Sequence, residues 1–215
     1  MDSDISNPYL LGINYIICFY FIIQRIIVFN WIWKNKEKYD NHEDKLYQKF
    51  GIFLPFRLLF TYTNYGNTLC FFNSLYFILY NQQPFSFVFP VVWTLVFSVT
   101  AGYWVLVYPF KNHSLLPINM NLEISGHGPL LILNSLSLYL YQYPVFELHH
   151  ILYTIYFNLF WLLCIWMPWY FLTGDYIYFV FKPNFPVFFK INIVIKMCLL
   201  SLMGFMIAHL IEFKV

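Results

Sequence analysis

Residues 122–143, LEISGHGPLLILNSLSLYLYQY, decide the fold. They form an apolar stretch long enough to cross a bilayer, which takes about 20 residues in a helix. Near its start His127 lies between Gly126 and Gly128, just before Pro129. A neutral imidazole can act as a general base near pH 7, and flanking glycines let other groups approach it closely. The other interpretation is an interfacial residue at the mouth of a membrane helix, because ionisable groups within spans are costly and rare.

The composition is that of an integral membrane protein. Hydrophobic residues make up 60% of the 215 residues and charged residues only 10%, too few for a water-facing surface. We predict an all-α fold, a polytopic transmembrane helical bundle of about six spans in a single domain. The lipid bilayer is the expected environment, and the net charge of +2 is too small to indicate a nucleic-acid partner. The expected spans cover residues 10–33, 53–80, 85–108, 122–143, 151–172 and 188–213.

Neither the cysteines nor the one histidine pair indicates a metal site or another cofactor. Each of the four cysteines lies alone in an apolar run, which is typical of reduced thiols rather than of a disulfide framework. His149 and His150 are adjacent, so on a helix they point in different directions, whereas metal ligands on one helical face need a spacing of three or four. We interpret this pair as interfacial.

The charged residues indicate the topology. Lysines gather in the loop of residues 34–51, and with six spans that loop shares a side of the membrane with Lys111, Lys182 and Lys190. The positive-inside rule then places the first, third and fifth loops in the cytoplasm and both termini outside or in the lumen. The first apolar run is followed by no small-residue cleavage site, so we expect it to be retained as a span.

One charge lies inside the first expected span. Arg25 stands well within residues 10–33, where a charged side chain costs about 2.5 to 3.5 kcal/mol on insertion scales. The side chain either extends to the membrane surface or pairs with an acid in the bundle. Its length favours the first of these.

The polar residues of the second expected span are ordered rather than scattered. Thr61, Asn64 and Thr68 recur at helical spacing and share one face, with Gly66 and Asn67 beside it. Such a face would turn away from lipid. It is either a set of hydrogen bonds between helices or the wall of a polar cavity.

Acidic residues stand near two of the histidines. Glu123 precedes His127 by four residues and could orient the imidazole if the helix has already begun there. His209 and Glu212 share a face of the last expected span. They could pair with each other, serve the region of Thr61 and His127, or lie at the membrane edge.

Several short motifs, spread over nearly the whole chain, occur in an order and at spacings that match those of a known family. They are Phe60-Thr61-Tyr62, Phe89-Pro90, Tyr103-Trp104, Tyr108-Pro109, Gly126-His127, Trp161 through Trp166, Thr173-Gly174 and an acid, Glu212, in the last span. Together they resemble the androgen-induced protein family of multi-pass membrane hydrolases. The chain departs from the family at Glu123 and Ile124, where the family usually has an asparagine and a further histidine. Glu212 is also offset from the family's acid by a residue or two, which leaves the third catalytic group open.

The resemblance implies an enzyme that cleaves fatty acid esters of hydroxy fatty acids with a threonine nucleophile and a histidine. The family's threonine, followed by an aromatic residue, falls on Thr61, and its histidine falls on His127. The implied substrate is an acyl-chain lipid. The expected location is an integral, multi-pass position in the endomembrane system, such as the endoplasmic reticulum, or in the plasma membrane.

The implied chemistry is consistent with the residues. A threonine hydroxyl is a weak nucleophile at neutral pH and needs an adjacent base, which His127 can provide. Asn64, or the backbone amides near Gly126 and Gly128, are candidate donors to the oxyanion of the tetrahedral intermediate.

The rival hypothesis is a non-enzymatic membrane protein. Arg25, Asn64, His127 and Lys196 could line the polar path of a small transporter, or the chain could be a structural partner of another membrane protein. An inverted repeat would favour transport, and the two halves of the chain show none.

Overall fold

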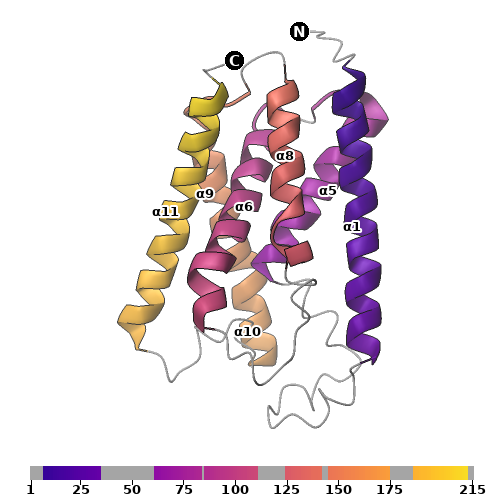
Figure 1. Cartoon of the computed structure of the whole chain (residues 1–215). Helices are drawn as coiled ribbons and strands as arrows, with labels where there is room; N and C mark the ends of the chain where they lie inside the picture. Colours follow the sequence, from indigo (N-terminus) through magenta and orange to yellow (C-terminus); the bar gives the residue numbers. More distant parts are fainter. Residues whose placement is uncertain are drawn as a thin grey trace.

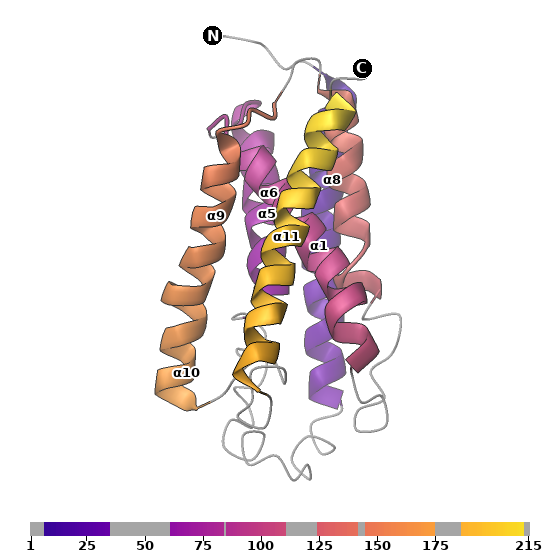
Figure 2. The ribbon, with the colours of Figure 1, turned by 90° about the vertical axis from the view of Figure 1, so that its left-hand side faces the viewer.

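The computed structural model describes residues 7–34, 61–83, 85–110, 124–141, 145–174 and 186–212. In these ranges the chain is all-α, as predicted, and its helices form six rods that run roughly along one axis (Figure 1, Figure 2). The first four rods are α1 (Pro8–Lys34), α5 (Tyr62–Tyr80), α6 (Val88–Gly102) with the π-helical η2 (Tyr103–Val107) and 3₁₀-helical η3 (Tyr108–Phe110), and α8 (Pro129–Leu140). The last two are α9 (His150–Phe160) with the π-helical η4 (Trp161–Trp166) and α10 (Met167–Thr173), and α11 (Val187–Glu212).

Four helical stretches in the described ranges are long and apolar enough to cross a membrane, as expected of an integral multi-pass membrane protein. They are Pro8–Trp31, Val88–Leu106, His150–Thr173 and Val187–Glu212. Each agrees within a few residues with an expected span, apart from residue 213, which lies outside the described residues. This agreement follows from composition, because long apolar runs carry the signal by themselves.

Helix α5 is the most polar of the rods. It is 19 residues long, and its buried side chains include Asn64, Asn67, Asn73 and Ser74. Asn64, Gly66 and Asn67 of the predicted polar face are therefore buried, whereas Thr68 is half-buried. Residues 53–60, the first part of the expected second span, lie outside the described residues.

Helix α8 is shorter than the sequence predicted. Its 12 residues extend about 18 Å at 1.5 Å per residue, less than the roughly 30 Å of a bilayer's hydrocarbon core. Residues 124–126 form a single helical turn, and the helix breaks at His127 and Gly128 before α8 begins at Pro129. The sequence left open whether the helix is continuous through Gly126 and Pro129, and the structure has a break there. The reason is local: proline has no N–H to continue a preceding helix, and Gly128 has a non-helical backbone (φ −148°, ψ −65°).

Helix α6 lies at the centre of the bundle. Of its membrane-length window, 61% is buried, against 28% or less for the other three long helices. One core cluster joins it to the start of α1 and the end of α11 through Leu10, Phe89 and Phe205. Another joins it to the start of α5 and to η4 through Tyr62, Leu95 and Trp161. The start of α1 and the end of α11 therefore lie at the same end of the bundle (Figure 1).

Candidate functional site

Thr61 begins helix α5 and caps it. Its backbone is extended (φ −69°, ψ 148°), and its Oγ1 accepts hydrogen bonds from the backbone N–H of Asn64, at 3.2 Å, and from Asn64 Nδ2, at 2.9 Å. A threonine at this position satisfies one of the N–H groups that a helix start leaves without an intrahelical acceptor. The sequence predicted Thr61 inside a helix, whereas the structure places it just before one, at the N-cap position. Thr61 and Asn64 are therefore neighbours because of the capping hydrogen bonds.

Asn64 connects Thr61 to helix α1. Its Nδ2 donates to Thr61, and its Oδ1 accepts from Nη1 of Arg25. Only 7% of Asn64 is exposed. One buried amide thus links the guanidinium of α1 to the hydroxyl that starts α5.

Asn67, one helical turn further along α5, reaches the segment that carries His127. Its Nδ2 donates to the carbonyl oxygen of Gly126 at 3.3 Å. Further along the same two helices Asn134 Nδ2 donates to Cys70 Sγ at 3.0 Å. Later residues of α8 thus meet later residues of α5, so the two helices run parallel and start at the same end of the bundle.

His127 is held by helix α6 and its π-helical continuation. The imidazole stacks on the ring of Tyr103, with centroids 3.6 Å apart and an angle of 4° between the planes. The carbonyl oxygen of His127 accepts from Trp104 Nε1 at 3.0 Å, and its N–H donates to Ile124 at 3.2 Å. Both aromatic residues lie in η2, and π-helical turns inside α-helices often occur at functional sites.

The residues around His127 are packed closely against α1 and against each other. Tyr20 donates its phenol hydroxyl to the carbonyl oxygen of Ser125 at 2.5 Å. A Cβ on Gly128 would lie 3.2 Å from the carbonyl oxygen of Ile124, so this position favours glycine. A Cβ on Gly126 would have Gln24 Nε2 as its nearest neighbour, at 3.9 Å. Two groups of hydrogen bonds thus leave successive turns of α5, one among Arg25, Asn64 and Thr61 and one from Asn67 to the segment of His127. They are together called the polar cluster, defined as Arg25, Thr61, Asn64, Asn67 and residues 125–127.

Three other predicted site residues lie elsewhere. Glu212 accepts from the backbone N–H groups of Val145 and of Phe146, the latter at 2.9 Å, and His209 Nδ1 lies 3.0 Å from the carbonyl oxygen of Phe146. Both residues therefore bind the connection between α8 and α9, at the opposite end of the bundle from Thr61. Of the alternatives left open by the sequence, service to the region of Thr61 and His127 does not fit this position, whereas a place near one edge of the bundle does. Glu123 lies outside the described residues.

A cleft of about 150 Å³ lies near the polar cluster, although no residue of that cluster lines it. Residues of α5, α6, α9 and α11 line it, and so does Tyr103, the residue on which His127 stacks. The lining is mostly apolar, which suits an acyl chain.

A chain of polar groups crosses this cleft. Tyr62 donates to Asn158 Oδ1, Asn158 Nδ2 donates to Ser201 Oγ at 3.3 Å, and Ser201 Oγ lies 2.8 Å from Ser98 Oγ. The sequence analysis did not single out Ser98, Asn158 or Ser201. The only signal available was that each is a lone polar residue in an apolar span, where such residues commonly bond across helices.

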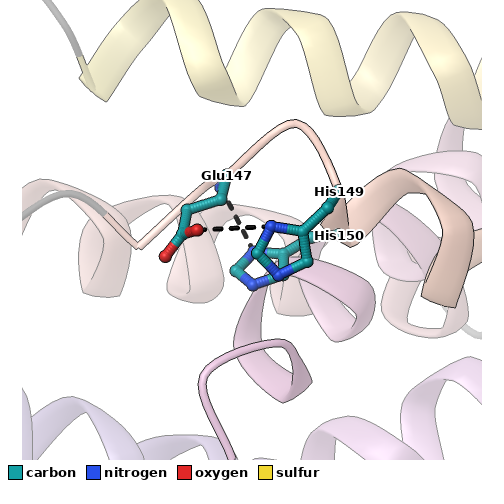
Figure 3. Close-up of side chains that lie close together, drawn as sticks. All are labelled: Glu147, His149 and His150. Atoms are coloured by element: carbon teal, nitrogen blue, oxygen red, sulfur yellow. Dashed lines mark hydrogen bonds and ion pairs between the residues drawn. The ribbon is translucent and has the colours of Figure 1, made fainter.

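One group of side chains has the composition of a metal site. Glu147, His149 and His150 lie at the start of α9, and one ligand atom from each lies within 4.8 Å of the others (Figure 3). His149 Nδ1 is 3.2 Å from a carboxylate oxygen of Glu147, and His150 Nδ1 accepts from the Glu147 backbone N–H at 3.2 Å. That hydrogen bond leaves the proton of neutral His150 on Nε2, so metal ligation would require the loss of the hydrogen bond at Nδ1 or a change of tautomer that frees Nε2. The histidine pair is thus engaged with Glu147.

The four cysteines are free thiols, as predicted. Comparison of the chain with protein-family models, with curated proteins and with solved structures finds no match. Tyr103-Trp104 and Trp161 through Trp166, which the sequence analysis singled out, lie in the π-helical segments η2 and η4.

Proposed function

We propose that this chain is an intramembrane lipid-ester hydrolase in which Thr61 is the nucleophile and His127 the general base. The observation that carries the proposal is the polar cluster. Hydrogen bonds connect Thr61 to Asn64, and Asn67, one turn further, to the carbonyl next to His127. The two residues stand at the starts of parallel helices, inside a bundle that otherwise presents apolar side chains to lipid.

In the proposed reaction the Thr61 hydroxyl attacks the carbonyl carbon of an ester while His127 accepts its proton. The tetrahedral intermediate collapses as His127 protonates the leaving alcohol, and an acyl-threonine remains. Water, deprotonated by His127, then hydrolyses that ester and releases the fatty acid. The two N–H donors of Asn64 that bind Thr61 Oγ1 stabilise negative charge as it develops there. Amides near Gly126 and Gly128 are the proposed donors to the oxyanion.

The surroundings support a lipid substrate. The cleft lies between helices whose outer faces are apolar, so an acyl chain can enter sideways from the bilayer. Tyr103 lines this cleft and stacks on His127, and therefore lies between the binding space and the proposed base. We further propose that all six rods cross the membrane and that the chain is related to the androgen-induced family. That relation makes fatty acid esters of hydroxy fatty acids the substrates to test first, with the endomembrane system or the plasma membrane as the location.

The decisive experiment separates the two roles of the Thr61 side chain, that of helix cap and that of proposed nucleophile. Asparagine caps a helix at least as well as threonine but has no hydroxyl, whereas serine retains both functions. In protein purified into nanodiscs, Thr61→Asn should therefore remain folded and lose at least about a thousandfold in ester turnover, while Thr61→Ser keeps measurable turnover. Thr68→Val, two turns further along α5, is the matched control.

A second readout identifies the attacked residue directly. A lipid-like fluorophosphonate should form an adduct on the peptide that contains Thr61 in the wild type and none in Thr61→Asn or His127→Ala. Turnover retained by folded Thr61→Asn would refute the nucleophile. A wild-type protein that neither hydrolyses esters nor reacts with the probe would favour the non-enzymatic alternative, in which Thr61 is only a helix cap.

A further inference from the structure

Arg25 is half-buried, and its guanidinium points into the bundle. It precedes Lys34, the end of α1, by nine residues, which is about 14 Å along a helix. Its Cζ lies 4.6 Å from the ring centroid of Phe21, one turn back toward the start of α1, and its Nη1 donates to Asn64. The side chain therefore points away from the nearer helix end, and the expectation that it extends to the surface was wrong.

The charge of Arg25 has no anionic partner among the described residues. Glu147 and Glu212 are the carboxylates in that part of the chain, and both are engaged at the opposite end of the bundle. Asn64, the hydrogen-bond partner of the guanidinium, is neutral. Burying a charge without a counter-charge is expensive, and an ionisable residue inside a span is a candidate functional group for that reason.

The two guanidinium nitrogens of Arg25 without a hydrogen-bond acceptor indicate which kind of group could bind there. Nε and Nη2 of Arg25 are buried and have no hydrogen-bond partner among the described residues. These two nitrogens lie on one edge of the guanidinium, and their N–H groups point the same way. That edge binds both oxygens of one carboxylate, or two oxygens of a phosphate, through parallel hydrogen bonds.

We propose that Arg25 binds the acid group of an anionic amphiphile, a carboxylate or phosphate whose acyl chain lies in the apolar part of the bundle. Asn64, which also binds Thr61, occupies Nη1, so the bound acid group lies on the opposite edge of the guanidinium from the proposed nucleophile. The second part of the inference rests on the proposed function: Arg25 makes the enzyme select esters that carry a free acid group over their neutral counterparts.

The binding test needs no turnover. Protein in nanodiscs of neutral phosphatidylcholine is titrated with oleate and, separately, with methyl oleate, which has the same chain without the charge. The wild type should bind oleate at least about tenfold more tightly. Equal affinity of the wild type for the two ligands would overturn the proposal without any variant.

Variants then assign the selectivity to Arg25. Arg25→Gln should abolish the preference for oleate, and Arg25→Lys, which keeps the charge but not the two-pronged edge, should retain part of it. Lys34→Gln removes the same charge from the exposed end of the same helix and should change nothing. An unchanged preference in folded Arg25→Gln would also overturn the proposal.

Two further arms identify the acid and its source. Dodecyl phosphate that competes with oleate shows that the edge accepts phosphate, and its failure to compete restricts the site to carboxylates. Phosphatidic acid in the nanodisc that suppresses oleate binding identifies a lipid headgroup as an occupant, and its failure to do so identifies a free acyl acid. Every one of these results presupposes a charge-selective site at Arg25.

The outcome for this inference is separable from that for the proposed function. Turnover of an acid-bearing ester and of its methyl ester is compared in the wild type and in Arg25→Gln. Oleate binding through Arg25 without any ester turnover would retain the anion site and remove the hydrolase. Turnover that depends on Thr61, with a ratio between the two esters that Arg25→Gln leaves unchanged, would retain the hydrolase and remove the role of Arg25.

Discussion

At the residue scale, Thr61 and His127 are each held by groups that also have a structural role. The Thr61 hydroxyl caps α5, and the His127 carbonyl accepts the indole N–H of Trp104. A side chain that is held in place loses little entropy when it reacts, which is an advantage for a catalytic group. Because of these contacts, replacing either residue by alanine would change both the stability and the activity of the protein. Each test therefore needs a substitution that removes the proposed catalytic role and keeps the structural contact, or the reverse.

Trp104 offers such a test as a positioning residue. Trp104→Phe removes one hydrogen bond to the backbone of His127, worth about 0.5 to 1.5 kcal/mol, and leaves an aromatic ring in place. Under the proposed function we expect kcat to fall by up to about tenfold with little change in KM, because the change displaces the proposed base rather than the proposed acyl-binding space.

The matched control is Trp93→Phe. Trp93 lies in the same helix, and its Nε1 is buried without a hydrogen-bond partner among the described residues. The control loses the same indole atoms and no bond, so its kcat should be unchanged. Equal effects of the two substitutions on kcat would show that the hydrogen bond does not position His127.

At the scale of elements, the interruption before α8 is the most unusual feature. Non-helical backbone is tolerated at membrane depth only where protein surrounds it or where it lines a cavity. Here the carbonyl groups of Ser125, Gly126 and His127 are taken up by Tyr20, Asn67 and Trp104, which come from three different helices. The interruption thus holds His127, which is half-buried, against α6 and its π-helical continuation.

The contact between α6 and α11 depends on a glycine. A Cβ on Gly204 would lie 2.5 Å from Cδ1 of Phe97, whose ring stacks on Trp93 and has little freedom to move. Gly204→Ala should therefore destabilise the protein by about 1 to 3 kcal/mol. Thermal unfolding in detergent measures the change.

Gly12 provides the control for Gly204. A Cβ there has no atom within 4 Å, so Gly12→Ala should be neutral, or stabilising by up to about 1 kcal/mol through helix propensity. If Gly204→Ala unfolded at the same temperature as Gly12→Ala, α6 and α11 would not approach as closely as described.

At the scale of the whole molecule, α1 begins and α11 ends at the same end of the bundle (Figure 1). The lysine-rich loop after α1 follows the other end, which the positive-inside rule assigns to the cytoplasm. We expect glycosylation acceptor tags at both termini to be modified, and a tag inserted between residues 36 and 44 to remain unmodified. Modification of only one terminus would contradict an even number of membrane crossings.

Properties that depend on local composition and period could be read from the sequence. Four long helices appear close to where their apolar runs predict them, and the polar side of α5 turns inward because Asn64 and Asn67 recur at helical spacing. A break near Gly128-Pro129 was one possibility that the glycines and the proline indicated in the sequence.

Only the tertiary structure decided which polar groups meet. It turns Arg25 inward to Asn64, assigns His209 and Glu212 to the opposite end of the bundle, and brings Asn158 and Ser201 together. These contacts join residues far apart in the chain, and they depend on the direction and rotation of each helix. The physical reason is that the apolar runs of a membrane bundle specify that helices form and insert, whereas close packing and hydrogen bonds between helices determine their partners.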